Sequence, residues 1–130
     1  MDIVIDTSAL LAVIVDEPER EEIVNSTAGH TLIAPASVPW EVGNAFSAMF
    51  KKGRVSLEEA QEGVSIFEGI PVRYTIPALA ASLEIAYKYD LYSYDAYLLE
   101  CALRRGAPLL TLDRRLIKAG KSLGVICLEV

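Results

Sequence analysis

Short, fully apolar segments alternate along this chain with longer segments of helical periodicity. The first, at residues 2–6, places Ile-Val-Ile between two acids, a run that is too short for a helix and typical of a buried strand. Strands that alternate with helices favour an α/β fold, and strands without a polar face are covered on both sides. We therefore expect a three-layer sandwich with a central parallel sheet of about five strands. The expected strands are 2–6, 31–34, 70–74, 108–112 and 125–128.

Polar residues and glycines mark where helices begin and end between these strands. Ser56-Leu-Glu-Glu59 is a capping box that opens a helix to about Glu68, and Asp113 opens another to about Lys121. Further helices are expected at 7–16, at 19–26, at 38–52 with Ser37 as its cap, and at 94–105 with Ser93 as its cap and Gly106 as its stop. Another helix is expected after Thr75 as its cap. Its inner face is expected to carry Leu79, Leu83, Ala86 and Tyr87.

The length of 130 residues suits one domain, here expected to span 1–130, since no linker or repeat interrupts the chain. The longest apolar run, 9–15, has seven residues, whereas a membrane-spanning helix needs about 20. Asp6 stands where a signal peptide would continue its apolar stretch. Cys101 and Cys127 form no spaced framework and are expected to be reduced thiols. These features predict a cytoplasmic protein without a membrane segment.

The net charge of −6 is unevenly distributed. Residues 1–70 hold 12 acids and 4 bases, whereas residues 71–130 hold 6 acids and 8 bases. Because nucleic-acid-binding surfaces are usually basic, the composition alone argues against such a partner and leaves room only for a local basic stripe. The mean hydropathy of +0.33 is high for a small chain and predicts exposed apolar surface, used in a homodimer and by a further protein partner.

Four acids stand at or near the carboxyl ends of expected strands, where parallel α/β sheets bind ligands. Asp6 ends the first strand, and Asp113 follows the strand 108–112. Asp95 lies in the first turn of one helix, and Glu41 lies one turn inside another. If the four meet in one cleft, a divalent cation would offset their repulsion, and oxygen ligands favour Mg²⁺ or Mn²⁺. Such ions activate water when a phosphodiester bond is cut.

Each acid also has a purely structural interpretation. Asp95 is favourable in a first helical turn through the helix dipole, and Asp113 is an ordinary N-cap. Glu41 could lie with Asn44 on a solvated helix face. Asp6 differs, because an acid directly after a buried Ile-Val-Ile strand has no evident structural role. The conjunction of all four therefore indicates a catalytic metal site.

Each of the four acids lies in a short motif, and the motifs follow one another along the chain. They are Val4-Ile-Asp6-Thr-Ser-Ala-Leu10, Trp40-Glu41-Val-Gly-Asn44-Ala, Ser93-Tyr-Asp95-Ala-Tyr-Leu-Leu and Leu110-Thr-Leu-Asp113-Arg-Arg-Leu. Together they resemble PIN-domain ribonucleases, most closely the VapC toxins of toxin–antitoxin pairs, over essentially the whole chain. The resemblance implies a central parallel sheet and an Mg²⁺- or Mn²⁺-dependent endonuclease that acts on RNA, with an antitoxin as partner. It implies that the catalytic and metal-binding acids are Asp6, Glu41, Asp95 and Asp113.

Thr7 or Ser8 matches the polar residue that follows the first acid in this family. Some members carry a further acid after the fourth one, but here Arg114 and Arg115 follow, so the resemblance leaves open whether one or two metal ions are held. These arginines either bind phosphates or form a solvated helix face, and with Thr7, Ser8 and Asn44 they are candidate substrate contacts. Four aromatic residues either stack on bases or pack in the core or a dimer: Trp40, Tyr92, Tyr94 and Tyr97.

Three other functions are compatible with parts of the pattern. A signalling receiver domain has a similar length and a strand-end Asp, but it usually carries adjacent acids and a late Lys-Pro. Here Thr7 and Ser8 follow Asp6, and no Lys-Pro occurs. A haloacid-type phosphatase would need a second Asp at the position of Ser8. A non-catalytic PIN-like binding module would fit the negative net charge.

Overall fold

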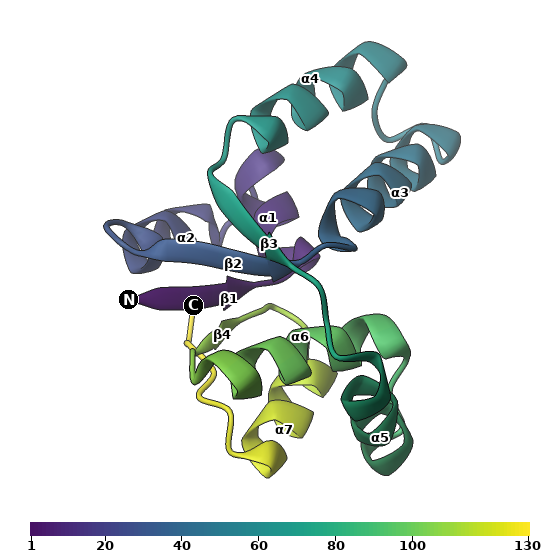
Figure 1. The fold of residues 1–130 in the computed structure, drawn as a ribbon. Coiled ribbons are helices and arrows are strands. Elements are labelled where there is room, and N and C mark those ends of the chain that lie inside the picture. Colours follow the sequence, from purple (N-terminus) through teal and green to yellow (C-terminus); the bar gives the residue numbers. More distant parts are fainter.

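A four-stranded parallel sheet with the strand order β3-β2-β1-β4 forms the centre of the computed structural model, which describes residues 1–130 (Figure 1). Ile3 pairs with Leu32 on one side of β1, and Val4 pairs with Leu109 on the other. The parallel α/β architecture expected from the alternating pattern is confirmed. The strands are β1 (Asp2–Ile5), β2 (Thr31–Pro35), β3 (Val72–Thr75) and β4 (Leu109–Leu110).

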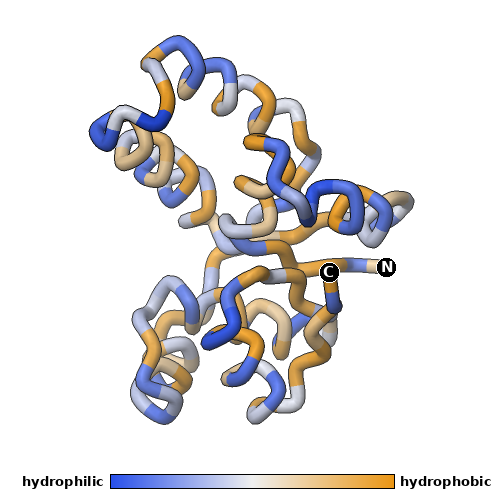
Figure 2. Tube along the Cα trace, turned by 180° about the vertical axis from the view of Figure 1, so that it is seen from behind, coloured by the Kyte–Doolittle hydropathy of each residue, from blue (hydrophilic) through white to orange (hydrophobic).

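Helices cover both faces of the sheet and complete the three layers. Buried side chains of α1 to α4 pack against one face, and those of α5 to α7 pack against the other. Figure 2 shows that the central strands are hydrophobic, whereas the outer helical turns are largely hydrophilic. None of the helices combines the length and apolarity needed to cross a membrane. They are α1 (Thr7–Ile14), α2 (Arg20–Thr27), α3 (Val38–Lys51), α4 (Leu57–Glu68), α5 (Leu79–Tyr89), α6 (Ser93–Arg105) and α7 (Arg114–Leu123).

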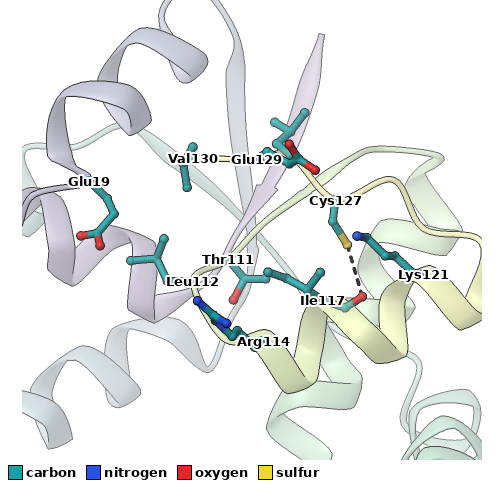
Figure 3. A pocket seen from close by; sticks show the side chains of 10 residues that line it. Glu19, Thr111, Leu112, Arg114, Ile117, Lys121, Cys127, Glu129 and Val130 are labelled. Atoms are coloured by element: carbon teal, nitrogen blue, oxygen red, sulfur yellow. Dashed lines mark hydrogen bonds between the residues drawn. The ribbon is translucent and has the colours of Figure 1, made fainter.

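The C-terminal segment adds a single bridge to the sheet edge rather than the complete fifth strand expected at 125–128. Leu109 pairs in parallel with Cys127. The Leu109 N–H donates to the Ile126 carbonyl at 2.8 Å, and the Leu128 N–H donates to the Leu109 carbonyl at 2.9 Å. The tail therefore runs beside β4 and close to α7 (Figure 3).

β4 is also shorter than the expected strand 108–112, for a reason that bears on function. Beyond Leu110 the backbone bonds to side chains instead of to a neighbouring strand. The Leu112 N–H donates to the Ser8 hydroxyl at 3.0 Å. The Thr111 side chain turns toward the carboxyl end of β1, as described below. The strand thus stops where the chain begins to build a polar site.

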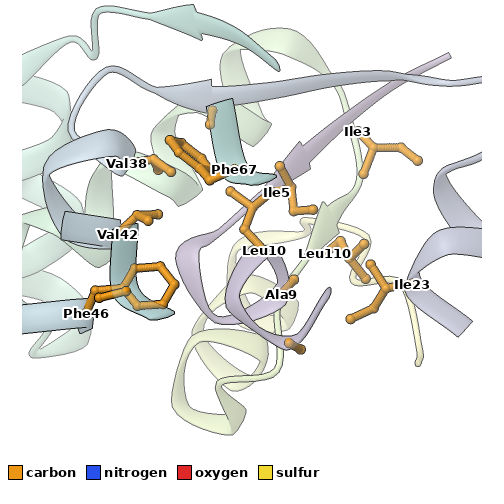
Figure 4. Close-up of a cluster of buried hydrophobic side chains, with 13 residues drawn as sticks. Ile3, Ile5, Ala9, Leu10, Ile23, Val38, Val42, Phe46, Phe67 and Leu110 are labelled. Atoms are coloured by element: carbon orange, nitrogen blue, oxygen red, sulfur yellow. The ribbon is translucent and has the colours of Figure 1, made fainter. Parts of the chain in front are cut away.

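Side chains of β1 alternate between the two faces of the sheet. Ile3 and Ile5 enter the hydrophobic cluster beneath α1 to α4, where Leu10 and Phe46 also lie (Figure 4). Val4 enters the opposite cluster, beneath α5 to α7. Each buried aliphatic side chain of this size contributes about 1.5–3 kcal/mol relative to exposure, so β1 is firmly fixed. The residue that follows it is therefore held in a defined place.

α5 turns a different face to the core from the one expected. Its buried residues are Ser82 and Ile85. Ser82 is tolerated there because its hydroxyl donates to the Ala78 carbonyl at 2.8 Å, within its own helix. Of the four residues expected on the inner face, Ala86 packs against the core, whereas Leu79, Leu83 and Tyr87 are exposed.

Two expected helix caps were wrong, and a third is confirmed in position only. Thr75 lies within β3, where it is buried, and α5 begins after Ala78 instead. Ser93 is the first residue of α6 rather than its cap. Ser37 is the N-cap residue of α3, as expected, but its hydroxyl donates to the Glu41 carboxylate at 2.9 Å and makes no capping hydrogen bond.

Other helix boundaries are confirmed. Ser56 and Glu59 exchange the two hydrogen bonds of a capping box, at 3.0 and 2.9 Å. Gly106 ends α6 with a left-handed φ of 60°, a conformation that costs glycine little. Asp113 accepts the Arg115 N–H at 2.9 Å and is the N-cap of α7.

Candidate active site

Asp6 is one of two buried acids of the chain and lies directly after β1. Its side chain is 5% exposed, and it accepts hydrogen bonds from the Ser8 hydroxyl at 2.7 Å, the Ala9 N–H at 3.0 Å and the Thr111 hydroxyl. It forms no ion pair with a basic side chain, since the two ion pairs of the structure lie elsewhere. Burial raises the pKa of Asp6, the three hydrogen bonds lower it, and the charge of Asp113 raises it further.

Two hydroxyls tie Asp6 to the loop between β4 and α7. Ser8 donates to Asp6 and accepts from the Leu112 N–H. Thr111 donates to Asp6 and accepts from the Asp113 N–H at 3.0 Å. Thr111 was not among the expected site residues. Its signal is a polar residue inside an apolar strand segment, two positions before an acid.

Glu41 lies in the first turn of α3 and is held from its own helix. The Ser37 hydroxyl donates to its carboxylate. Partial burial raises the pKa of Glu41, the Ser37 hydrogen bond lowers it, and the negative charges of Asp6 and Asp95 raise it. Glu41 is therefore not on a separate solvated face, because it is electrostatically linked to acids from two other segments.

Asp95 and Asp113 complete the acidic group. Asp95 lies in the first turn of α6. Burial raises its pKa, the charge of Asp113 raises it as well, and the positive charge of Arg115 lowers it. Asp113 caps α7 through Oδ1, which also receives the Leu116 N–H at 3.4 Å. The cap that the sequence suggested is thus real, and it does not separate Asp113 from the other acids.

The four carboxylates form a closed sequence of interactions at one edge of the sheet. The negative charge of Asp113 raises the pKa of both Asp6 and Asp95. The negative charges of Asp6 and Asp95 in turn raise the pKa of Glu41. All four are oxygen donors of the kind that Mg²⁺ and Mn²⁺ prefer. A cation would also offset the uncompensated charge of buried Asp6. The donor chemistry therefore fits a divalent cation, although no three of the side chains are drawn together into a coordination group.

The remaining candidate residues lie in three different pockets around these acids. Thr7 and Asn44 line a pocket of about 450 Å³ together with Glu41. Arg115 lines a second, beside α5, of about 320 Å³. Arg114 lines a third, of about 490 Å³, between α7 and the C-terminal tail (Figure 3). The two arginines therefore line pockets on different sides of α7. The positive charge of Arg115 lowers the pKa of Asp95, an acid of the site.

Comparison with known families decides the classification. Residues 3–122 match the family described as PIN domain. The chain belongs to the PIN domain family. This assignment excludes the receiver domain and the haloacid-type phosphatase as alternatives. It also agrees with the order of motifs in the sequence.

Individual PIN relatives cover most of the chain. It is 30% identical over 124 residues to Ribonuclease VapC3 of Pyrobaculum aerophilum, which covers 89% of this chain and 92% of that protein. The crystal structure of PAE2754 from the same organism matches with a TM-score of 0.75 and 25% identity, over 98% of this chain and 83% of that one.

Two further solved structures share the fold at lower identity. The VapBC2 structure of Rickettsia felis, bound to a DNA fragment from their promoter, matches with a TM-score of 0.71 and 18% identity, over 98% of both chains. VapC20 of Mycobacterium tuberculosis, described as a Sarcin-Ricin loop cleaving toxin, matches with a TM-score of 0.64 and 14% identity, over 91% of this chain and 95% of that one.

Proposed function

We propose that this PIN domain is a metal-dependent endoribonuclease that acts as the toxin of a toxin–antitoxin pair. The observation that carries the proposal is the group of four interacting carboxylates at the carboxyl edge of the sheet, with Asp6 buried and in no ion pair with a basic side chain. The similarity to Ribonuclease VapC3 supports RNA as the substrate class. The acidic composition is compatible with a nuclease because a bound divalent cation would offset half of the charge of the four carboxylates and attract the phosphate.

Asp6, Asp95 and Asp113 would hold Mg²⁺ or Mn²⁺, with Glu41 as a further ligand or as the base that accepts a proton from water. When bound, such an ion lowers the pKa of water and stabilises the leaving oxygen. The raised pKa of Glu41 suits proton acceptance, because a general base works best when its pKa lies closer to the operating pH.

Other residues of the chain position the reacting groups. Ser8 and Thr111 orient the Asp6 carboxylate through their hydroxyls. Arg115, whose positive charge lowers the pKa of Asp95, would bind a phosphate oxygen. In-line attack of water at phosphorus would leave a 5′-phosphate on one fragment and a 3′-hydroxyl on the other.

The test is cleavage of a structured RNA by purified protein with Mn²⁺. Asp6→Asn and Asp95→Asn keep the side-chain shape and remove a charge, so both should abolish cleavage. Glu62→Gln on α4 is the matched control, because it also removes one negative charge but lies outside the acidic group. Equal cleavage by all four proteins would point to a contaminating nuclease. A wild type that binds RNA without cutting it would support a non-catalytic PIN module instead.

We further propose a cognate antitoxin that covers the active site. The fold similarity to a VapBC2 chain supports a partner of this kind. Its gene should be a short neighbouring reading frame with a DNA-binding pattern and an amphipathic C-terminal segment. The product, expressed and purified alone, should form a complex with this chain and stop RNA cleavage. Cleavage that continues in the complex would contradict a partner at the active site.

A further inference from the structure

Two exposed aromatic residues line a pocket that also contains Glu41. Trp40 on α3 is 77% exposed, and Tyr94 on α6 is 55% exposed. Exposed apolar side chains that gather around a groove commonly mark a binding site. The pocket has a volume of about 450 Å³, within the range of small-molecule sites. It is lined by Thr7, Trp40, Glu41, Asn44, Ala45 and Tyr94.

Both rings are next to acids of the candidate active site. Trp40 directly precedes Glu41, and Tyr94 directly precedes Asp95. Glu41 lines the pocket itself, and the charge of Asp95 acts on Glu41. A group bound in this pocket would therefore lie beside acids of the candidate active site.

The chemistry of the lining selects the kind of group. Glu41 is the only charged residue, and neither Lys nor Arg lines this pocket, so it is unsuited to a phosphate. The Asn44 amide offers both a donor and an acceptor. The Thr7 hydroxyl is buried and faces the Glu41 carboxylate, whose pKa it lowers, so it adds a polar group to the lining. Flat aromatic walls with a few polar groups fit an uncharged, planar, hydrogen-bonding ring.

We propose that this pocket binds one unpaired nucleobase of the RNA, next to the scissile phosphate, stacked on Trp40 and Tyr94. The proposal rests on the proposed ribonuclease function and adds to it that the substrate is single-stranded at the cut. Aromatic rings of this kind bind bases in many single-strand-binding proteins, because every base presents a stacking face. The phosphate backbone then passes on toward Arg115, whose charge acts on Asp95.

Trp40 is the only tryptophan of the chain, so its fluorescence reports on this pocket directly. The experiment uses the Asp6→Asn protein in Mn²⁺, which leaves the RNA intact. It is titrated with oligoadenylate and with a tetrahydrofuran–phosphate oligomer of the same length and charge that carries no bases. Oligoadenylate should quench the fluorescence, and the base-free oligomer should leave it unchanged.

Variants of the two rings separate stacking from general binding. Tyr94→Ala should weaken oligoadenylate binding roughly 5- to 100-fold, whereas Tyr94→Phe should bind within about twofold of the parent protein. Trp40→Ala, followed with fluorescently labelled RNA, should show a similar loss. Tyr74→Ala on β3 is the matched control, since it also removes a partly exposed tyrosine ring but lines none of the three pockets around the acids.

Equal quenching by the base-free oligomer, or equal binding by Tyr94→Ala and Tyr74→Ala, would overturn the proposal. A second copy of the chain could also occupy an exposed aromatic surface, and light scattering tests for such a dimer. If Trp40→Ala turns a dimer into a monomer without changing RNA binding, the rings are an interface and the proposal is wrong. Failure of the ribonuclease function gives a different result, because the unsubstituted protein would then not cut RNA at all.

Discussion

The Thr111 hydroxyl donates a hydrogen bond to the buried carboxylate of Asp6, which stands 105 positions earlier in the chain. The same hydroxyl accepts the Asp113 N–H. One side chain thus links two acids that come from opposite ends of the sequence. It can do so because β1 and β4 are neighbours in the sheet and both end at the same edge.

Replacing this hydroxyl should damage both stability and activity. Thr111→Val keeps the shape of the side chain but leaves the Asp113 N–H without its acceptor and Asp6 without one of its donors. Leaving buried polar groups unpaired costs about 1–3 kcal/mol, so urea unfolding should show a loss of that size. RNA cleavage should fall at least about tenfold, because a misplaced carboxylate is a poor ligand or base.

Thr111→Ser is the control for that substitution, since it retains the hydroxyl and removes only a methyl group. It should keep most of the activity. If Thr111→Val and Thr111→Ser cut RNA equally well, the hydroxyl does not position Asp6.

The position of Asp6, buried at the end of β1, could be predicted from sequence because its signal is local. A buried strand followed at once by an acid is visible within five residues. The capping box at Ser56 and the N-cap at Asp113 are local in the same way, and both are confirmed. Thr111 has only a weaker local signal, a polar residue in an apolar segment, and its link to Asp6 depends on the pairing of β1 with β4 across most of the chain.

α5 shows the same limit for packing. Its sequence contains two apolar stripes, and the helical period alone does not say which faces the core. α5 packs against α6 with the stripe that contains Ser82 and Ile85, so this stripe is buried. A serine on the buried face argues against that stripe until its hydrogen bond to the Ala78 carbonyl is known.

The other stripe of α5 leads to a prediction about assembly. Leu79, Leu83 and Tyr87 recur every four residues, lie on one helix face and are exposed, Tyr87 at 91%. We expect this face to pair with its copy in a homodimer, so light scattering at micromolar concentration should give about twice the chain mass of 14.2 kDa. Leu83→Glu should produce the monomer, whereas Leu57→Glu on α4 should not. A monomeric wild type would contradict the prediction.

The metal-free protein should be more stable at mildly acidic pH than at neutral pH. Burial raises the pKa values of Asp6, Glu41 and Asp95 in the folded state. In the window between the ordinary and the raised values the folded state binds more protons than the unfolded chain, so stability falls as pH rises through the raised values. The melting temperature in chelator should therefore be higher near about pH 5 than near pH 7.

Glu100 sets the lower limit of that window. Despite its burial, hydrogen bonds from Arg104 and from the Ala78 N–H lower its pKa. Its contribution to stability is therefore lost only below the ordinary Glu value of about 4.3. A melting temperature that falls between pH 7 and pH 5 would show that the three acids are not destabilised by their charge.

Neutralising Asp6 should stabilise the protein without metal although it destroys activity. Asp6→Asn removes the repulsion with Asp113 and Glu41 and the cost of a buried charge. Asn is also a good N-cap, so the bond from the Ala9 N–H can persist. A gain of about 1 kcal/mol would raise the melting temperature by about 2–8 °C in chelator.

Millimolar Mn²⁺ should raise the melting temperature of the wild type, because it binds the folded state better than the unfolded one, and this rise should shrink in Asp6→Asn. Asp113→Asn is the comparison, since it keeps the cap of α7 and also removes one charge of the group. A wild type that Mn²⁺ leaves unchanged, with neither variant more stable than it in chelator, would mean that the acids do not act as one site.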